Sequence, residues 1–279
     1  MRKGRCLGLC LALVLLLCAC AGVNLEGNST TLPTCEILPA ETVIEDTTPA
    51  ATMEVPETTT AETETTAPAH SALYLPEYTS QQVWEYFEEV VLRTEYSDGT
   101  GNAALVQKWK EPIIYSIYGT PTEEDLSVLT ALFAQLNEIP GFPGIYAREE
   151  GEPETLMIGF WDPENFNMYF WDFLNGEDAY GATQFWYYND TNEIYTANVG
   201  YRTDIDQSTR TSVLIEEIIN MLGISDTVLR TDSIVYQYSN DNTALSDMDW
   251  LILKLLYHPA IQCGTDFDGC RTVIEELYY

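Results

Sequence analysis

The chain has 279 residues, enough for one large domain or two small ones, and it carries 44 Asp and Glu residues against 12 Lys and Arg, a formal net charge of −32. A polyanion of this kind repels nucleic acid and anionic lipid, so no nucleic-acid partner is expected. An excess of acid also simply keeps a protein soluble.

The first segment of the chain is typical of a secretory signal. A short basic stretch, residues 1–5, precedes an apolar run from Cys6 to Ala21, shorter than the ~20 residues of helix that span a bilayer. The run closes on Leu-Cys-Ala-Cys, which resembles the lipobox of bacterial lipoproteins. In that motif cleavage follows a small residue and the next Cys receives a diacylglyceryl group. Because Ala19 is small, residues 1–19 are the predicted signal peptide and Cys20 the predicted lipidation site.

Two acyl chains give stable membrane anchoring. We therefore expect an exported, bacterial cell-membrane lipoprotein whose domain faces the exterior, and the membrane is a partner only through the lipid anchor. An uncleaved membrane anchor is the alternative.

Residues 20–72 are built mainly from Thr, Glu, Pro and Ala. No Lys or Arg occurs between Arg5 and Arg93, and no apolar periodicity appears before residue 73. Such a stretch cannot bury enough surface to offset its chain entropy. It is predicted to be a disordered acidic stalk.

Residues 73–279 are rich in aromatic and aliphatic side chains and are expected to form one α+β domain with a mixed sheet and packed helices. Ser80 and Thr120 are the expected N-caps of the first two helices, on either side of a strand over 109–119. The remaining expected elements, in chain order, are strands at 155–161, 166–173, 182–188 and 194–201, helix 209–222, an extended stretch 232–238, a helix from Ser246 to Tyr257, and helix 269–277.

Helix 209–222 has an apolar face and a polar face, and taken alone it is an ordinary amphipathic helix with Gly223 as its stop. Its spacing suggests a second interpretation. In zincin peptidases H-E-x-x-H places two zinc-binding imidazoles on one helical face, and metzincins continue with x-x-G-x-x-H/D. The residues that fall on these positions are Glu216, Glu217, Asn220, Gly223 and Asp226.

The downstream sequence adds to the resemblance. Metzincins carry S-[IV]-M-x-Y and then L-[ST]-x-x-D leading a helix that ends in Leu-Tyr. This chain has "SIVYQY" at 233–238, with Val235 in the Met position, and "LSDMDWLILKLLY" at 245–257. From about Gln81 onward the chain resembles DUF2927, a bacterial family of exported proteins that are similar to metzincins. The shared features are the "W..P" strand at 109–112, the helix ending in Leu-Gly-Ile at 222–224, and the "LLY.P" ending at 255–259.

This resemblance implies a zincin-like fold, with Glu217 as a general base, Asp226 as a ligand and Gly223 at the turn. Glu216 and Asn220, however, stand where the histidines should be, and the whole chain has two histidines, His70 and His258. A catalytic zinc usually needs three protein ligands dominated by imidazole. We therefore expect no cofactor, and the oxygen ligands of Glu216, Asn220 and Asp226 could hold at most a weakly bound divalent cation.

Two further sets of residues are candidates for chemistry. Trp161, Trp171 and Trp186 lie in aromatic stretches and could stack on a sugar or grip a peptide, although rings of this kind also fill sheet cores. Cys263 and Cys270 are close in sequence and could form a disulfide in an oxidising exterior, or remain two buried thiols.

The leading functional interpretation is a lipid-anchored extracellular protein whose zincin-like domain has lost hydrolytic activity. It would act as a non-catalytic binding or structural module towards an envelope or extracellular protein or a glycan. One alternative is an atypical metal-dependent peptidase that uses Glu217 as general base. The other is a carbohydrate- or peptide-binding module that uses the aromatic strands.

Overall fold

The computed structural model describes residues 71–92, 105–174 and 179–279, which belong to one compact unit. The predicted signal peptide, Cys20 and residues 20–70 of the stalk lie outside the described residues. In the part of the chain that is described, no helix is both long enough and apolar enough to cross a membrane.

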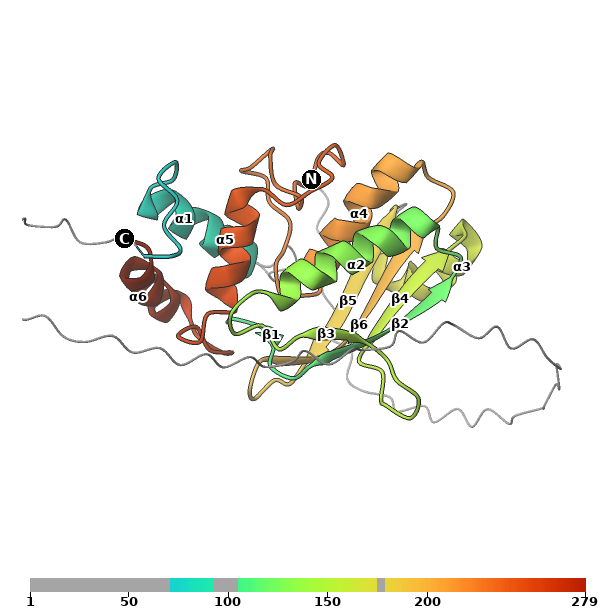
Figure 1. Cartoon of the computed structure of the whole chain (residues 1–279), viewed down its shortest axis with the longest axis horizontal. Coiled ribbons are helices and arrows are strands. Elements are labelled where there is room, and N and C mark those ends of the chain that lie inside the picture. The colour runs from blue at the N-terminus through green and yellow to red at the C-terminus, as the bar shows by residue number, and fades with distance from the viewer. Residues whose placement is uncertain (1–70, 93–104, 175–178) are drawn as a thin grey trace, which may run out of the picture. The chain divides into compact units, whose positions relative to one another are not determined.

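The described residues form a mixed α/β fold around one twisted sheet (Figure 1). Its strands are β1 Lys108–Trp109, β2 Ile113–Gly119, β3 Ile145–Ala147, β4 Leu156–Trp161, β5 Gly181–Tyr187 and β6 Glu193–Arg202. Strands β1, β6, β4, β2 and β3 are neighbours in that order and pair in parallel, whereas β5 pairs antiparallel with β6. The predicted mixed sheet with packed helices is therefore confirmed.

The helices are α1 Ser80–Phe87, which continues as the π-helical segment Glu88–Leu92, α2 Glu123–Asn137, α3 Pro163–Leu174, α4 Gln207–Asn220, α5 Asp247–Leu256 and α6 Phe267–Leu277. Helices α2 and α4 pack side by side over one face of the sheet, and α3 packs on the other face. Helices α1, α5 and α6 gather beside the sheet, at the left of the view in Figure 1.

Strand β4 shows why the sheet divides the core into two layers. Leu156, Ile158 and Phe160 point to the α2/α4 side and join the main core, where each is at most 1% exposed. The alternate residues Met157 and Trp161 pack on the α3 side, because successive strand residues face opposite ways.

Two predicted helix caps were wrong by one or two residues. The N-cap of α1 is Thr79 rather than Ser80, and the N-cap of α2 is Thr122 rather than Thr120. In each helix the N-cap hydroxyl accepts the backbone N–H of the residue three positions on, and that residue's side chain accepts the backbone N–H of the N-cap. The pairs are Thr79 with Gln82 and Thr122 with Asp125, so both caps are reciprocal. The helix predicted from Ser246 begins as expected, because Ser246 caps α5 and Asp249 completes a reciprocal cap with it.

The strand predicted over 166–173 was also wrong, because this segment lies within α3. Asp162 accepts the backbone N–H of Asn165 at 2.9 Å, and Pro163 occupies the first helical position. Phe166 and Phe170, one helical turn apart, are the side chains that this helix buries against the sheet.

Candidate functional site

Helix α4 begins two residues earlier than predicted, because the Asp206 carboxylate caps it by accepting the backbone N–H of Thr209 at 3.0 Å. After the helix the chain turns at Gly223, whose φ is +97°. A β-carbon there would lie 2.1 Å from the carbonyl oxygen of Gln107, so only glycine fits. The predicted role of Gly223 as the stop of this helix is therefore supported by both its dihedral angle and its surroundings.

The turn brings Asp226 back to the end of α4. Asn220 Nδ2 donates to Asp226 Oδ1 at 3.2 Å. On the preceding turn of the helix, Glu216 Oε2 accepts from Asn240 Nδ2 at 3.0 Å. We call these four half-buried residues the α4 polar cluster: Glu216, Asn220, Asp226 and Asn240. Each of these two hydrogen bonds joins a side-chain amide to a carboxylate.

Glu217 faces a different neighbour, the edge strand β5. A β-carbon on Gly181 would lie 2.8 Å from Glu217 Oε1, so the carboxylate rests directly against the backbone of β5. The same strand holds the helix backbone, because Thr183 Oγ1 donates to the carbonyl oxygen of Glu217 at 2.7 Å. Burial raises the pKa of Tyr201 well above its ordinary value, and the negative charge of Glu217 adds to that rise.

These donors do not fit a zincin-type zinc centre. Two of the three predicted ligand positions hold a carboxylate and an amide in place of imidazoles, and the Asn220 amide nitrogen is spent on Asp226. Among the described residues, no group of three or more His, Cys, Asp and Glu side chains is placed to hold a metal ion. The described histidine, His258, lies after α5, where its Nδ1 accepts the backbone N–H of Ala260.

One atom of the α4 polar cluster remains without a hydrogen bond. Asn220 Oδ1 is buried and has no partner among the described residues. A buried acceptor of this kind can take a water or a hard cation, which favours oxygen ligands.

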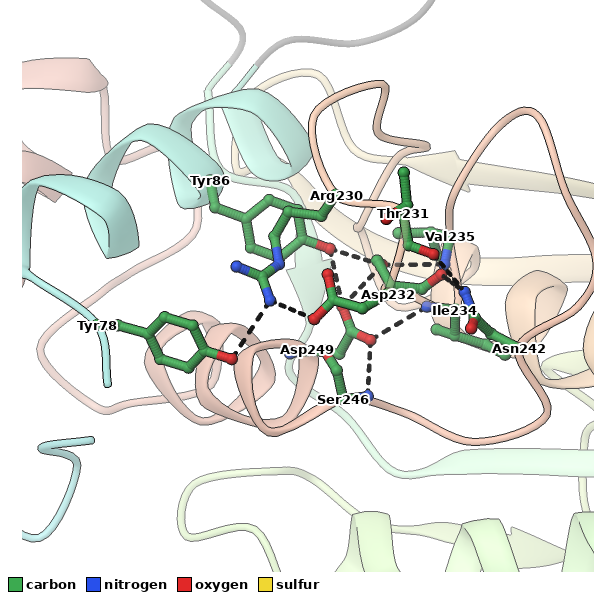
Figure 2. Close-up of polar contacts among 11 residues, drawn as sticks. Tyr78, Tyr86, Arg230, Thr231, Asp232, Ile234, Val235, Asn242, Ser246 and Asp249 are labelled. Atoms are coloured by element: carbon green, nitrogen blue, oxygen red, sulfur yellow. Dashed lines mark hydrogen bonds and ion pairs between the residues drawn. The ribbon is translucent and has the colours of Figure 1, made fainter. Parts of the chain in front are cut away.

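The segment at 233–235, which the resemblance compares with a metzincin Met-turn, is held by a second network (Figure 2), and its central residues Tyr86, Ser233 and Asp249 are buried. Asp249 Oδ1 accepts from Tyr86 Oη at 2.7 Å and from Ser233 Oγ at 2.8 Å. Its other oxygen accepts the backbone N–H groups of Ile234 at 3.1 Å and Ser246 at 2.9 Å. Asp249, which is 4% exposed, thus caps α5 and at the same time fixes the 233–235 segment against α1.

The remaining members of this Asp249 network extend it toward the surface. Burial, with Asp249 beside it, raises the pKa of Tyr86, so its hydroxyl stays a donor. The guanidinium carbon of Arg230 lies 5.0 Å from the centre of the Tyr78 ring and 5.5 Å from that of Tyr86, and Arg230 pairs with Asp232. Figure 2 shows Arg230 between the two tyrosines. The buried side chains of Tyr86, Ser233 and Asp249 are in contact. Their hydrogen bonds, which hold α1, α5 and the 233–235 segment together, are enough to explain this contact.

The three predicted ligand tryptophans lie in different environments. Trp161 folds back over Gly159 and stacks on Tyr169 with ring centroids 5.0 Å apart, and its Nε1 is buried. Trp186 on β5 is 37% exposed. Trp171 lies in α3, but its side chain is outside the described residues.

Cys263, which is half-buried, and Cys270, which is buried, are free thiols in this structure. Cys263 Sγ lies 3.5 Å from the carbonyl oxygen of Lys108, and burial raises the pKa of Cys270 to about 12. Nearby, Lys108 Nζ donates to the carbonyl oxygens of Leu256 at 2.8 Å and Ile261 at 2.5 Å. This buried lysine ties β1 to the end of α5.

Sequence reasoning missed two participants. Asn240 lies in a polar loop whose composition carries no sign of its contact with Glu216. Tyr86 lies in the first helix, where the helical period of apolar residues does not reveal that its hydroxyl meets Asp249. Both contacts join segments that are far apart in the chain.

The comparison with known proteins gives one family. The family model described as "Protein of unknown function (DUF2927)" matches residues 80–276, from the first residue of α1 to the last turn of α6. Curated proteins gave no match. The matched range includes α4, the 233–235 segment and the Asp249 network, and the chain therefore belongs to the DUF2927 family.

Proposed function

We propose that this protein is an exported bacterial lipoprotein, anchored through Cys20, whose domain is a non-catalytic, zincin-like binding or structural module at the cell envelope. The export and anchoring rest on the basic and apolar N-terminal segment and on Ala19 before Cys20. The module would act towards an envelope or extracellular protein or a glycan.

The zincin-like part of the proposal is supported by how α4 ends. Glycine at 223, with its positive φ, lets the chain return so that Asp226 meets Asn220, three residues before that glycine. This return is the purpose that Gly serves in the metzincin pattern. The 233–235 segment and the Asp249 cap follow in the expected order.

The single observation that carries the loss of catalysis is the pair of amide–carboxylate hydrogen bonds in the α4 polar cluster. An Asn side chain that donates to Asp226, and another that donates to Glu216, fasten the helix to the loops where a zincin would use its metal. Carboxylate and amide oxygens are hard ligands, and they do not assemble the imidazole-rich zinc that lowers the pKa of a bound water.

The test is to install the missing histidines and measure thermal unfolding with and without zinc. We expect zinc to leave the wild-type melting temperature unchanged and to raise that of the double variant Glu216→His/Asn220→His by several degrees. Ligand at about 100 times its Kd adds about 2.7 kcal/mol to the free energy of unfolding. The matched control is the same double variant with Asp226→Asn, which should respond less because the third ligand is weakened.

The two halves of the proposal fail separately. If the double variant gains no zinc response, the scaffold is not zincin-like at this helix. If the wild-type protein is itself stabilised by zinc and cleaves a general protein substrate in a reaction that Glu217→Gln abolishes, the protein is a peptidase.

A further inference from the structure

One face of the sheet is covered at only one end. Helices α2 and α4 cover the first face along its length, but on the second face α3 buries just Phe166 and Phe170, with Ala182 of β5 and the flanking Met157 and Trp161. Phe170 lies over Gly200, where a β-carbon would be 2.2 Å from its ring. Within the described residues, no other helix packs on this second face.

Strand register places two rows of side chains on the rest of that face, beside the α3 cluster, and the first row includes Met157, which flanks that cluster. The first row crosses four strands through paired residues: Gln184, Asn198, Met157 and Ser116. The second row consists of Trp186, Thr196, Thr155, Ile114 and Tyr146. Trp186 pairs with Thr196 and Ile114 pairs with Tyr146, and between these pairs the Thr196 hydroxyl donates to the Thr155 carbonyl oxygen at 3.0 Å. We call these positions the open sheet face.

The open sheet face is chemically unlike the rest of the protein. None of its nine residues is Asp, Glu, Lys or Arg, in a chain with 44 acidic residues. The amides of Gln184 and Asn198, opposite each other, make no side-chain hydrogen bond to any residue that the structure describes. Exposed aromatic rings stand at the two ends of the second row, Trp186 at 37% and Tyr146 at 52% exposure. Four strand spacings separate these ends, about 19 Å.

This chemistry restricts the occupant. An acidic ligand would be repelled by the net charge of −32. A basic ligand would find no carboxylate in either row, and the nearby carboxylate of Glu154 already accepts from Tyr118 Oη at 2.9 Å. An apolar surface packed on this face would leave the two amides buried without partners, which costs about 1–3 kcal/mol for each group. An uncharged ligand with many hydroxyls and apolar ring faces meets all the requirements, because amides both donate and accept hydrogen bonds and aromatic rings take C–H faces.

We propose that the open sheet face binds an uncharged oligosaccharide that runs across the strands from Trp186 toward Tyr146. This inference rests on the proposed binding role and names its ligand class. Gln184 and Asn198 hydrogen-bond the sugar hydroxyls along the chain of the ligand, and Trp186 stacks on one sugar ring.

The experiment is calorimetric titration of the purified protein with N-acetylglucosamine hexamer and with cellohexaose, and with oligogalacturonate as an acidic counterpart. We expect saturable binding of at least one uncharged hexamer and none of the acidic one. Trp186→Ala should weaken binding about five- to tenfold, Gln184→Ala should also weaken it, and Trp186→Phe should restore part of the affinity. Tyr238→Ala, at a 70% exposed tyrosine that is not in either row, is the matched control and should change nothing.

Three results would overturn the inference: no binding of either uncharged hexamer, equal loss in Tyr238→Ala, or a dimer in sedimentation that Trp186→Ala dissociates. The last would make the face a contact between copies of this chain. Zinc-dependent melting and proteolysis are read separately, so failure here is distinguishable from failure of the non-catalytic proposal.

Discussion

The α4 polar cluster and the Asp249 network lie in the same domain and are matched by the same family model, yet they are built differently. In the Asp249 network one carboxylate, 4% exposed, accepts four hydrogen bonds from two side chains and two backbone groups. In the α4 polar cluster the four residues are half-buried, two amide–carboxylate hydrogen bonds join them in pairs, and Asn220 Oδ1 has no hydrogen-bond partner among the described residues. The residues that hold the 233–235 segment surround one buried carboxylate with four hydrogen bonds, whereas those at the end of α4 are partly open to solvent.

The largest effect should come from removing the centre of the buried network. Asp249→Ala removes the acceptor of the Ser233 hydroxyl and of two backbone N–H groups, and leaves the Tyr86 hydroxyl only Ser233 Oγ, so we expect a loss of about 3–5 kcal/mol in the free energy of unfolding, measured in urea. Asp247→Ala, at an exposed position two residues earlier in the same helix, is the control and should cost less than about 1 kcal/mol. Equal losses would show that Asp249 acts only as a helix-terminal charge.

A second buried polar contact in this region should be visible in the pH dependence of stability. Burial lowers the pKa of Lys108 from 10.5 to about 8. Between these two values the unfolded chain binds more protons than the folded one, so this group makes stability rise with pH. We expect Lys108→Met to remove about 1–3 kcal/mol of that rise between pH 8 and 10.5.

The free thiols act with the opposite sign over the same range. Burial raises the pKa of Cys263 and of Cys270, so above the pKa of a free thiol the folded chain binds more protons than the unfolded one, and stability falls as pH rises. The measurement is therefore the difference between wild type and Lys108→Met in urea unfolding at each pH. Lys110→Met, at the exposed lysine beside Glu193, should leave the rise in place; if it removes the rise as well, Lys108 is not its source.

A smaller change sharpens the comparison within the buried network. Tyr86→Phe keeps the ring and deletes the hydroxyl that meets both Ser233 and Asp249, so we expect a loss of about 1–2 kcal/mol in urea unfolding. Tyr238→Phe, at an exposed ring, should be neutral. A neutral Tyr86→Phe would mean that the Asp249 carboxylate is satisfied without the phenol.

The smallest effect is expected in the α4 polar cluster. A double-mutant cycle with Asn220→Ala and Asp226→Ala should give a coupling free energy of about 0.5–1 kcal/mol, because the 3.2 Å bond is half-buried. A coupling above about 3 kcal/mol would place this pair with the buried network and erase the contrast between the two regions.

Local signals predicted most of the elements but not the contacts between them. Period-two apolar residues in β4 and β6 and the reciprocal cap Ser246–Asp249 were visible in the sequence, because each depends on near neighbours. The aromatic run at 166–173 favoured a strand by composition, and the decisive evidence was the Asp162–Pro163 pair before it, which starts a helix. The cap residues Thr79 and Thr122 were missed since neighbouring hydroxyls compete for the same role.

For the candidate site, the sequence placed Glu216, Asn220, Gly223 and Asp226 in one helical register, and the structure brings Asn220 and Asp226 together. The sequence could not reveal that Asn240 meets Glu216, or that Glu217 rests against β5, because those contacts depend on how distant segments pack. The same limit applies to the open sheet face, which emerges only when four strands are aligned by their register.

The most direct measurement is elemental analysis of the purified protein after equilibration with zinc and removal of free metal, together with a proteolysis assay. In the proposed zincin-like arrangement one carboxylate and one amide, Glu216 and Asn220, stand at the histidine positions, so zinc should remain far below one ion per chain and no cleavage should be found. One tightly held zinc ion per chain, with proteolysis that chelation stops and Glu217→Gln abolishes, would contradict the proposal that this domain has lost its catalytic metal.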